Sequence, residues 1–269
     1  MNASDPELAR RYFDQGFVHP IDLMTDIEVE GHYARLLGYE RHNGPLHYRV
    51  KPYLVFSSAY EIATHPNLLD AVEQVLGPDI LLWDASFIVK EPDSKGFISW
   101  HQDMTYWGLE ADSDDDLVSA WVALTPAMQM NGCMQFVRGS HRGPRLEHKD
   151  TYDENNLLHR GQEIENQFDE SLVTHLEMQP GQASLHHGWA VHSSNPNASH
   201  TRRVALAINY VRPNVRQTVT DGESATLVRG EDRYGHFRHE PTCGEDNLPE
   251  NVAFQLEVER LKREVYSNA

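Results

Sequence analysis

The sequence lacks the features that would direct a chain into a membrane or an oxidising compartment. No apolar run approaches the about 20 residues that cross a bilayer, and the opening segment MNASDPELARR lacks the apolar core of a signal peptide. Only two cysteines occur, Cys133 and Cys243, and they form no CxxC pair. We therefore expect a soluble protein of the reducing cytoplasm.

Basic clusters are also scarce. The formal net charge is −18, and no Lys/Arg cluster gathers on a single segment. Such a charge repels phosphate backbones and anionic lipids, so neither nucleic acid nor a membrane surface is expected as a partner. A small-molecule substrate is compatible with this charge, because one arginine in a cleft can bind a carboxylate through two hydrogen bonds. The sequence does not indicate an oligomeric state.

Low-complexity tracts, internal repeats and long blocks of like charge are absent as well. The 269 residues, 39% of them hydrophobic, are enough for one large core, and we expect a single domain over residues 1–269. Within it, a mostly helical lead-in over residues 1–79 precedes a strand-rich core over residues 80–215. Residues 216–269 are expected to form a C-terminal extension that ends in a helix.

Capping and stop signals predict three helices before the first strand. Thr25 and Glu28 form a capping-box pattern, and Gly38 is the expected end of that helix. The third helix begins at Pro66 and stops at Gly77. The expected helices, including the one near the C-terminus, cover about residues 6–15, 26–37, 66–76 and 252–265.

From residue 80 the pattern changes to short segments typical of strands, separated by Gly, Pro and Asn turns. Such a series indicates a sandwich or barrel with the early helices packed on one sheet. The segment 142–171 is polar and long for a connection, so it is a candidate lid. The expected strands are Ile80–Lys90, Phe97–Trp100, Leu117–Leu124, Cys133–Val137, Leu172–Met178, Ala183–His192 and Arg203–Val211.

The triplet His101-Gln102-Asp103 is the first candidate for a metal site. On a strand, residues i and i+2 face the same way, so both side chains can reach one ion. The motif alone is weak, because a chain with 16 His and 41 acidic residues contains such triplets by chance. His101 differs from the others because the aromatic Tyr106 and Trp107 follow it and would wall a site. The competing triplets are His148/Asp150 and His175/Glu177.

A third ligand has to come from a distant strand, and the segment 180–197 offers His186, His187 and His192. Read as one strand, it places His186 and His192 on one face and His187 on the other, so at most one face serves a metal. Two His and one carboxylate leave open positions on an octahedral ion, which suits Fe(II) oxygenases that bind a 2-oxo acid and O2. Two alternatives stay open: a zinc-dependent hydrolase, since these ligands also suit zinc, and a non-catalytic jelly-roll binding protein.

A 2-oxo acid with a second carboxylate also needs a cation. Arg203 lies eleven residues past His192, at the head of the apolar strand VALAINYV. Its neighbour Arg202 has the opposite parity and should face elsewhere. An arginine at the start of a strand is more often a surface residue, so this interpretation depends on the other site residues.

These residues stand in motifs that resemble the phytanoyl-CoA dioxygenase superfamily of Fe(II)/2-oxoglutarate oxygenases, in particular its bacterial branch with ectoine hydroxylase and aminophosphonate hydroxylases. The motifs are WHQD, NGCMQFVRGSH, NNLLHRGQE and PGQASLHHGWAVHSSNPN, and they spread over most of the chain. The resemblance implies a double-stranded β-helix, or jelly roll, with flanking helices. It agrees with the architecture expected from the strand and helix patterns.

The resemblance also implies roles for particular residues. Family members carry the distal iron ligand twelve residues beyond the Pro of the PG turn, which selects His192 beside His101 and Asp103. An arginine eleven residues past that ligand and a hydroxyl two residues past it bind 2-oxoglutarate, which matches Arg203 and Ser194. Trp107 is the implied wall of the substrate pocket. No role follows for Lys90, His186 or His187.

The activity implied by the resemblance is that of a dioxygenase using Fe(II), 2-oxoglutarate and O2. It would hydroxylate an aliphatic carbon and release succinate and CO2. Asp103 implies hydroxylation rather than halogenation, because related halogenases carry a small residue at this place.

The acidic surface and short length favour a small polar metabolite over a long acyl-CoA, whose phosphates would require a basic patch. Amino acids, ectoine-like compounds, aminophosphonates and quaternary amines all fit. Four aromatic residues are candidates for further pocket surface, including a cage for an ammonium group, although each is more often ordinary core. They are Tyr33, Tyr48, Tyr53 and Trp83.

Overall fold

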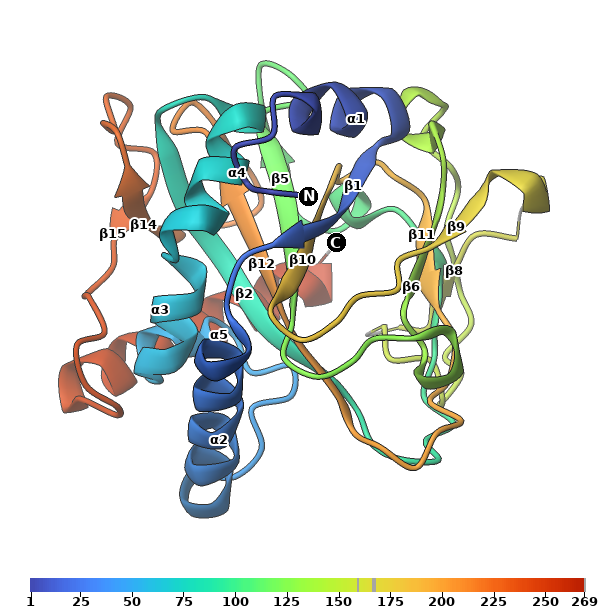
Figure 1. The fold of residues 1–269 in the computed structure, drawn as a ribbon. Coiled ribbons are helices and arrows are strands. Elements are labelled where there is room, and N and C mark those ends of the chain that lie inside the picture. The colour runs from blue at the N-terminus through green and yellow to red at the C-terminus, as the bar shows by residue number, and fades with distance from the viewer. Residues whose placement is uncertain (159, 166–167, 269) are drawn as a thin grey trace.

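Two β-sheets face each other, and helices cover the outer face of the larger sheet (Figure 1). The computed structural model describes residues 1–158, 160–165 and 168–268. Figure 1 shows α2 (Asp26–Asn43), α3 (Ser57–Ala63) and α4 (Pro66–Leu76) along one side of the large sheet and the small sheet on its other side. This is the predicted jelly roll with flanking helices, and the fold prediction is confirmed.

The large sheet has seven strands in the order β1-β10-β5-β12-β2-β14-β15. Neighbouring strands are antiparallel, except that β14 and β15 are parallel. The strands are β1 (Phe17–Asp22), β10 (Gln182–His186), β5 (Leu117–Ala123), β12 (Arg203–Val211), β2 (Ile80–Lys90), β14 (Ser224–Arg229) and β15 (Arg238–His239).

The small sheet has four strands in the order β3-β11-β6-β9, and two further two-stranded pairs are separate from it. Its strands are β3 (Ile98–His101), β11 (His192–Ser194), β6 (Met134–Val137) and β9 (Val173–His175). The pairs are β4 (Leu109–Glu110) with β13 (Arg216–Gln217), and β7 (Lys149–Asp150) with β8 (Gln162–Glu163).

The four predicted helices lie close to their expected positions, but the helix over residues 57–63 was not predicted. Thr25 and Glu28 form the predicted capping box, with the Glu28 amide donating to Thr25 Oγ1 at 3.3 Å. Gly38 does not end that helix, which continues to Asn43, so this predicted end is wrong. The helices are α1 (Glu7–Gln15), α2 (Asp26–Asn43), α3 (Ser57–Ala63), α4 (Pro66–Leu76) and α5 (Pro249–Asn268).

Two sequence expectations about strands are also wrong. The lead-in contains a strand, β1, whose Pro20 weakens any sequence signal for a sheet because proline donates no hydrogen bond. The expected strand 183–192 is two strands in different sheets: β10 ends at His186, and β11 begins at His192. The residues between them form a turn in which the Ala190 amide donates to the His187 carbonyl at 2.9 Å.

Apolar side chains fill both faces of the large sheet. On the outer face, alternate residues of β2 and β12 such as Phe87 and Leu206 pack against the helices. On the inner face, Trp121 of β5 and Phe136 of β6 pack together between the two sheets. The core is therefore continuous on the helical side, and the inner face is left to carry polar groups as well.

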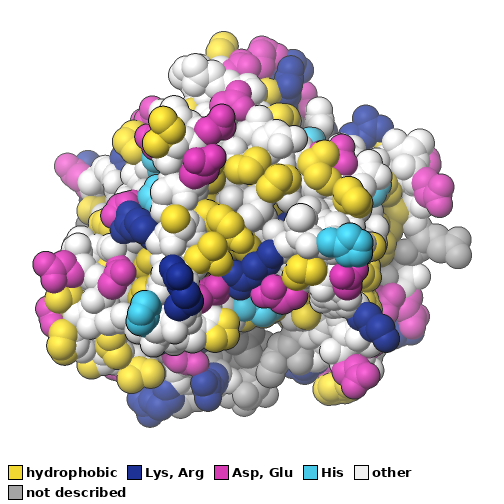
Figure 2. Space-filling view, turned by 60° about the horizontal axis from the view of Figure 1, so that its bottom comes forward, with side chains coloured by type: hydrophobic (Ala, Val, Ile, Leu, Met, Phe, Trp, Pro, Cys, Tyr) yellow, Lys and Arg dark blue, Asp and Glu magenta, His cyan; other side chains and the backbone are white. Residues whose placement is uncertain are grey.

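None of the helices in the described part of the chain combines the length and hydrophobicity that a bilayer span requires. On the face shown in Figure 2, lysine and arginine side chains are scattered among acidic ones and form no continuous basic patch.

Shortening Leu206 to alanine should lower the free energy of unfolding by about 2–5 kcal/mol, because the side chain is fully buried between β12 and the helices. Urea denaturation measures the loss. Leu256 on α5 is 55% exposed and provides the control, for which Leu256→Ala should change stability by about 0.5 kcal/mol or less. Equal losses in the two variants would contradict the assigned core.

Candidate metal centre

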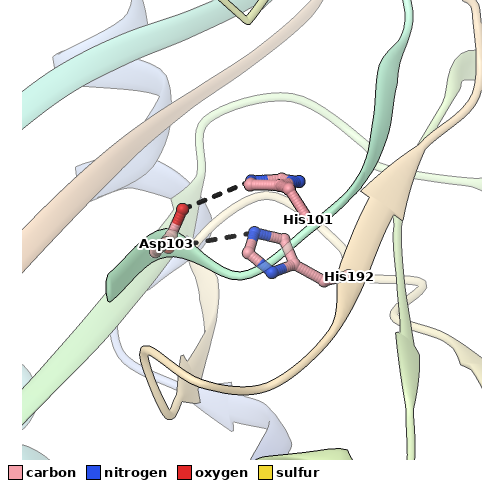
Figure 3. Close-up of side chains that lie close together, drawn as sticks. All are labelled: His101, Asp103 and His192. Atoms are coloured by element: carbon pink, nitrogen blue, oxygen red, sulfur yellow. Dashed lines mark ion pairs between the residues drawn. The ribbon is translucent and has the colours of Figure 1, made fainter. Parts of the chain in front are cut away.

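His101, Asp103 and His192 point toward one another across the end of the small sheet (Figure 3). One ligand atom from each lies within 4.8 Å of the other two. His101 Nε2 is 3.3 Å from Asp103 Oδ1, and His192 Nε2 is 3.9 Å from Asp103 Oδ2. The structure thus brings together the three residues that the sequence named as ligands.

Strand pairing produces this convergence. β11 runs antiparallel to β3, with His192 directly opposite His101. The two imidazole rings lie 4.0 Å apart, and the ring of Phe136 on β6 stacks on His192. Asp103 follows in a short 3-10 helix, η2 (Asp103–Thr105), that turns its carboxylate back toward both rings.

Backbone contacts orient both imidazoles. His101 Nδ1 contacts the Ser99 carbonyl at 2.8 Å, and His192 Nδ1 contacts the Ala190 carbonyl at 3.0 Å. A carbonyl only accepts, so each Nδ1 carries a proton, and each Nε2 is turned toward Asp103. Metal-ligating histidines are held in this way by a hydrogen bond from the other ring nitrogen.

The charges of the three groups suit a cation between them. Burial, followed by the neighbouring His101 ring, lowers the pKa of His192 to about 3, which keeps that imidazole neutral. Burial alone would raise the pKa of Asp103, but the nearby imidazoles, His192 foremost, hold it well below its ordinary value. Two neutral imidazoles and one carboxylate are the donor set of non-haem Fe(II) sites.

Gln102, between the two ligands of the motif, is buried and faces the other way. The backbone amide of Gln102 donates to His148 Nε2 at 3.0 Å. Its side-chain Oε1 accepts from the Leu146 backbone amide at 2.9 Å, and its side-chain Nε2 donates to the Trp189 carbonyl at 2.9 Å. Burial lowers the pKa of His148 to about 4, so its ring is neutral and able to accept. These contacts fasten the 142–171 connector and the turn before β11 to the metal-binding segment.

The triad lies in the wall of a cavity of about 260 Å³ between the two sheets. Aromatic and polar side chains line the rest of it, and the connector contributes Leu158 and Arg160. Residues 159, 166 and 167 of this connector lie outside the described residues, and its role as a lid stays a prediction. The other lining residues include Tyr48, Asp84, Ser86, Tyr106, Trp107, Ser119, Trp121, Ser194, Arg203 and Asn209.

Arg203 faces this cavity from the start of β12 and is only 1% exposed. Its Nε and Nη2 have no hydrogen-bond partner among the described residues, and its guanidinium lies 5.1 Å from the centre of the Trp121 ring. Burial lowers its pKa to about 10, which still leaves the group charged at neutral pH. A buried cation with unused donors fits an anionic ligand such as a carboxylate.

Ser194 also lines the cavity, but its hydroxyl is engaged. It donates to the Gly132 carbonyl at 3.0 Å and accepts from Lys90 Nζ at 2.5 Å. Lys90, which the sequence left without a role, lies opposite Arg203 on β2 and also donates to the Asn195 carbonyl. Burial and then the Arg203 charge lower the pKa of Lys90 to about 6. Lys90 therefore ties the end of β11 to β2.

The two other histidines that the sequence offered as ligands, His186 and His187, lie in different surroundings. His186 approaches the triad, with its Nε2 3.9 Å from Asp103 Oδ2, whereas His187 faces Asp115 at 3.4 Å and packs beside His141. The parity argument thus separated these two histidines correctly, although two strands rather than one carry them.

Other candidates are placed as follows. Arg202 pairs with Glu40 and Glu91 on the outer side, as expected. Trp107 lines the cavity against Trp83, and Tyr48 lines it too. Tyr53 is core, and Tyr33 packs against the helical core.

A sequence model of the phytanoyl-CoA dioxygenase family matches residues 51–205, which include all three triad residues and Arg203. The chain belongs to this family. Its cofactors are Fe(II) and 2-oxoglutarate, and the recognition made from the motifs is confirmed.

Among curated relatives, bovine peroxisomal phytanoyl-CoA dioxygenase is 28% identical over 177 residues, which cover 64% of this chain and 51% of the relative. A probable α-ketoglutarate-dependent hypophosphite dioxygenase of Stutzerimonas stutzeri is 29% identical over 165 residues, 59% of this chain and 54% of the relative. The chain thus spans about half the length of the curated relatives it matches.

The solved structure of the apo non-haem monooxygenase ThoJ matches along nearly the whole chain. It is 34% identical with a TM-score of 0.84, covering 97% of this chain and 98% of that one. CytC3 with Fe(II) and α-ketoglutarate, at 19% identity and a TM-score of 0.65, shares the fold. An epimerase, SnoN, shares it too at 22% identity, so the fold alone does not select the reaction.

Replacing Gln102 with alanine should weaken Co(II) binding about tenfold, because the segment between two of the three ligands loses its contacts to the connector and to Trp189. A spectroscopic Co(II) titration measures the change. Gln129→Ala, at an exposed position, is the matched control. Unchanged Co(II) affinity in Gln102→Ala would show that these contacts do not hold the ligands.

Proposed function

We propose that this protein is an Fe(II)- and 2-oxoglutarate-dependent dioxygenase that hydroxylates an aliphatic carbon of a small polar metabolite. His101, Asp103 and His192 would hold the iron, and Arg203 would bind the far carboxylate of 2-oxoglutarate. The observation that supports this most is the His101-Asp103-His192 set in the same cavity as a buried guanidinium with unused donors.

Iron and 2-oxoglutarate, when bound, supply the oxidising chemistry that consumes O2, releases succinate and CO2 and delivers one oxygen atom to the substrate. The chain's own contribution is positional. Backbone carbonyls hold the two imidazoles in the tautomer that presents Nε2, and the aromatic cavity wall limits access of water.

Ser194, which the resemblance implies as a second 2-oxoglutarate contact, lines the same cavity as Arg203. Its hydroxyl hydrogen is directed at the Gly132 carbonyl, so Ser194 has to rotate before it can donate to a carboxylate. Among the described residues, none accepts a hydrogen bond from Nε or Nη2 of Arg203, so Arg203 is the main group that binds the far carboxylate of 2-oxoglutarate in this proposal. The presence of a carboxylate at Asp103 favours hydroxylation, since that position is then occupied by the protein.

A small polar substrate fits the cavity better than a long acyl chain. The volume is about 260 Å³, and the lining mixes aromatic rings with Asp84, Ser119 and Asn209. An amino acid, an ectoine-like compound, an aminophosphonate and a quaternary amine all remain within this class.

The decisive experiment is an anaerobic titration of the protein with Fe(II) and 2-oxoglutarate, followed by absorbance spectroscopy. A visible metal-to-ligand band is expected. Metal analysis and 2-oxoglutarate-dependent succinate release then separate this function from that of a zinc hydrolase, which needs no 2-oxoglutarate. Mass spectrometry of candidate metabolites for a gain of one oxygen identifies the substrate.

Asp103→Ala should abolish succinate release and reduce bound iron to background, because one of three ligands is lost. Iron content after desalting and succinate formation are the two measurements. Asp115→Ala is the control, because Asp115 pairs with His187, which is not part of the triad. Full activity in Asp103→Ala would remove Asp103 from the ligand set.

Arg203→Gln should raise the Kd for 2-oxoglutarate about 10- to 100-fold, because hydrogen bonds to charged groups contribute about 1.5–3 kcal/mol. The anaerobic band provides the titration signal. Arg202→Gln is the matched control, since Arg202 pairs with Glu40 and Glu91 away from the cavity. An unchanged Kd for 2-oxoglutarate in Arg203→Gln would show that another cation binds the far carboxylate of 2-oxoglutarate.

A further inference from the structure

A row of polar side chains crosses the inner face of the large sheet. In register from strand to strand, Asp84 of β2 lies opposite Asn209 of β12, Asn209 opposite Ser119 of β5, and Ser119 opposite His186 of β10. All four line the cavity. The row therefore leads from the triad, which His186 approaches, to a carboxylate on the far side of the same cavity.

A β-bulge aims Asp84 inward. Leu82 pairs with Tyr210 and Asp84 with Asn209, so Trp83 has no partner on β12. At the bulge, Trp83 packs against Trp107 of the cavity wall, and the next residue, Asp84, lines the cavity. Two consecutive residues thus face the same side, which a regular strand does not allow.

Asp84 belongs to a buried charge network built with the C-terminal extension. It pairs with Lys262 of α5, while Lys51 pairs with Glu240 at 2.6 Å and with Glu223 at 3.3 Å. These five side chains are between 0% and 12% exposed. Among the described residues, no other lysine, arginine or histidine forms an ion pair with the three carboxylates. The network therefore holds three acids and two ammonium groups.

Within this network, Lys51 is shared by Glu240 and Glu223, whereas Lys262 pairs with Asp84, so the network as a whole carries one unbalanced negative charge. Glu240 receives hydrogen bonds from Tyr53, Ser224 and Thr226 in addition to Lys51. Asp84 is the member of the network that lines the cavity, and its Oδ1 also accepts from the Ala85 amide at 2.9 Å. A buried carboxylate in a network one positive charge short favours a cationic ligand.

We propose that Asp84 binds a positively charged nitrogen of the substrate, and that the substrate class is therefore cationic amines rather than neutral or anionic metabolites. The assignment rests on the proposed function, since it places the substrate in the same cavity. Tyr48, Tyr106 and Trp107 supply aromatic surface there, which also favours an ammonium group.

The row also separates the charge from the reacting carbon. Asp84 lies three strands from His186, and at about 4.8 Å between strands this is roughly 14 Å between backbones. The charged nitrogen is thus bound at one end of an elongated molecule, and the carbon that is oxidised lies several bonds away from it, near the triad.

Three probes with the same chain length test the charge preference: hexylammonium, hexanamide and hexanoate. Binding is measured by ligand-observed NMR on the Zn(II)-loaded protein saturated with 2-oxoglutarate, and again on the metal-free protein. Hexylammonium should bind at least about tenfold more tightly than hexanamide, and hexanoate more weakly than either. Absence of this preference, including absence of any binding, overturns the proposal.

Asp84→Asn should weaken hexylammonium binding about tenfold and leave hexanamide unchanged, because the substitution removes the charge and keeps the shape. Ser86→Ala, on the same face of β2, is the control and should keep the preference. Because Asp84→Asn leaves Lys262 buried without its partner, the double variant Asp84→Asn/Lys262→Met is measured as well and should also lose the preference. Retained hexylammonium binding in a folded Asp84 variant overturns the proposal.

The two proposals fail separately. The anaerobic Fe(II)/2-oxoglutarate band depends on the triad and Arg203, and Asp84→Asn should leave it intact. If wild-type protein gives no band, the oxygenase function fails, while the probe preference in the metal-free protein still decides the role of Asp84.

Discussion

The antiparallel pairing of β11 with β3 is the constraint on which the site depends. It sets His192 opposite His101 and therefore determines whether an ion can bridge them. A shift of one residue would turn one imidazole to the opposite face of the sheet. Several contacts hold the register from outside: β6 pairs with the other edge of β11, Lys90 binds the Ser194 and Asn195 carbonyls, and Gln102 binds Trp189.

The sequence predicted this site better than it predicted the strands that form it. Local signals such as the Thr25/Glu28 capping box and the alternation in β2 depend on a few neighbouring residues, and both were located correctly. The break between His186 and His192 was missed because the intervening residues 188–191, Gly-Trp-Ala-Val, are apolar and resemble a continuing strand. The triad was nevertheless recognisable, since motif spacing carries over whichever sheet each histidine occupies.

Other parts of the site had no local signal. Asp84 lies within the apolar run ILLWDASFIVK, and only its pairing with Lys262, 178 residues further along the chain, together with a bulge, gives it a place in the cavity. Lys90 could not be assigned because its partners lie on β11. Long-range charge pairs and bulges are set by the packing of distant elements, so a single sequence does not reveal them.

The pair β2 and β12 separates opposite charges within one cavity. Lys90 and Arg203 lie opposite each other at one end, and Asp84 and Asn209 lie opposite each other six residues away, roughly 20 Å along the strands. Because the bulge lies beyond this interval, the spacing is the same on both strands. An oxo-acid attracted to the guanidinium and a cation attracted to Asp84 would therefore occupy opposite ends without competing. On this basis, the register of two central strands, rather than a flexible loop, keeps co-substrate and substrate apart.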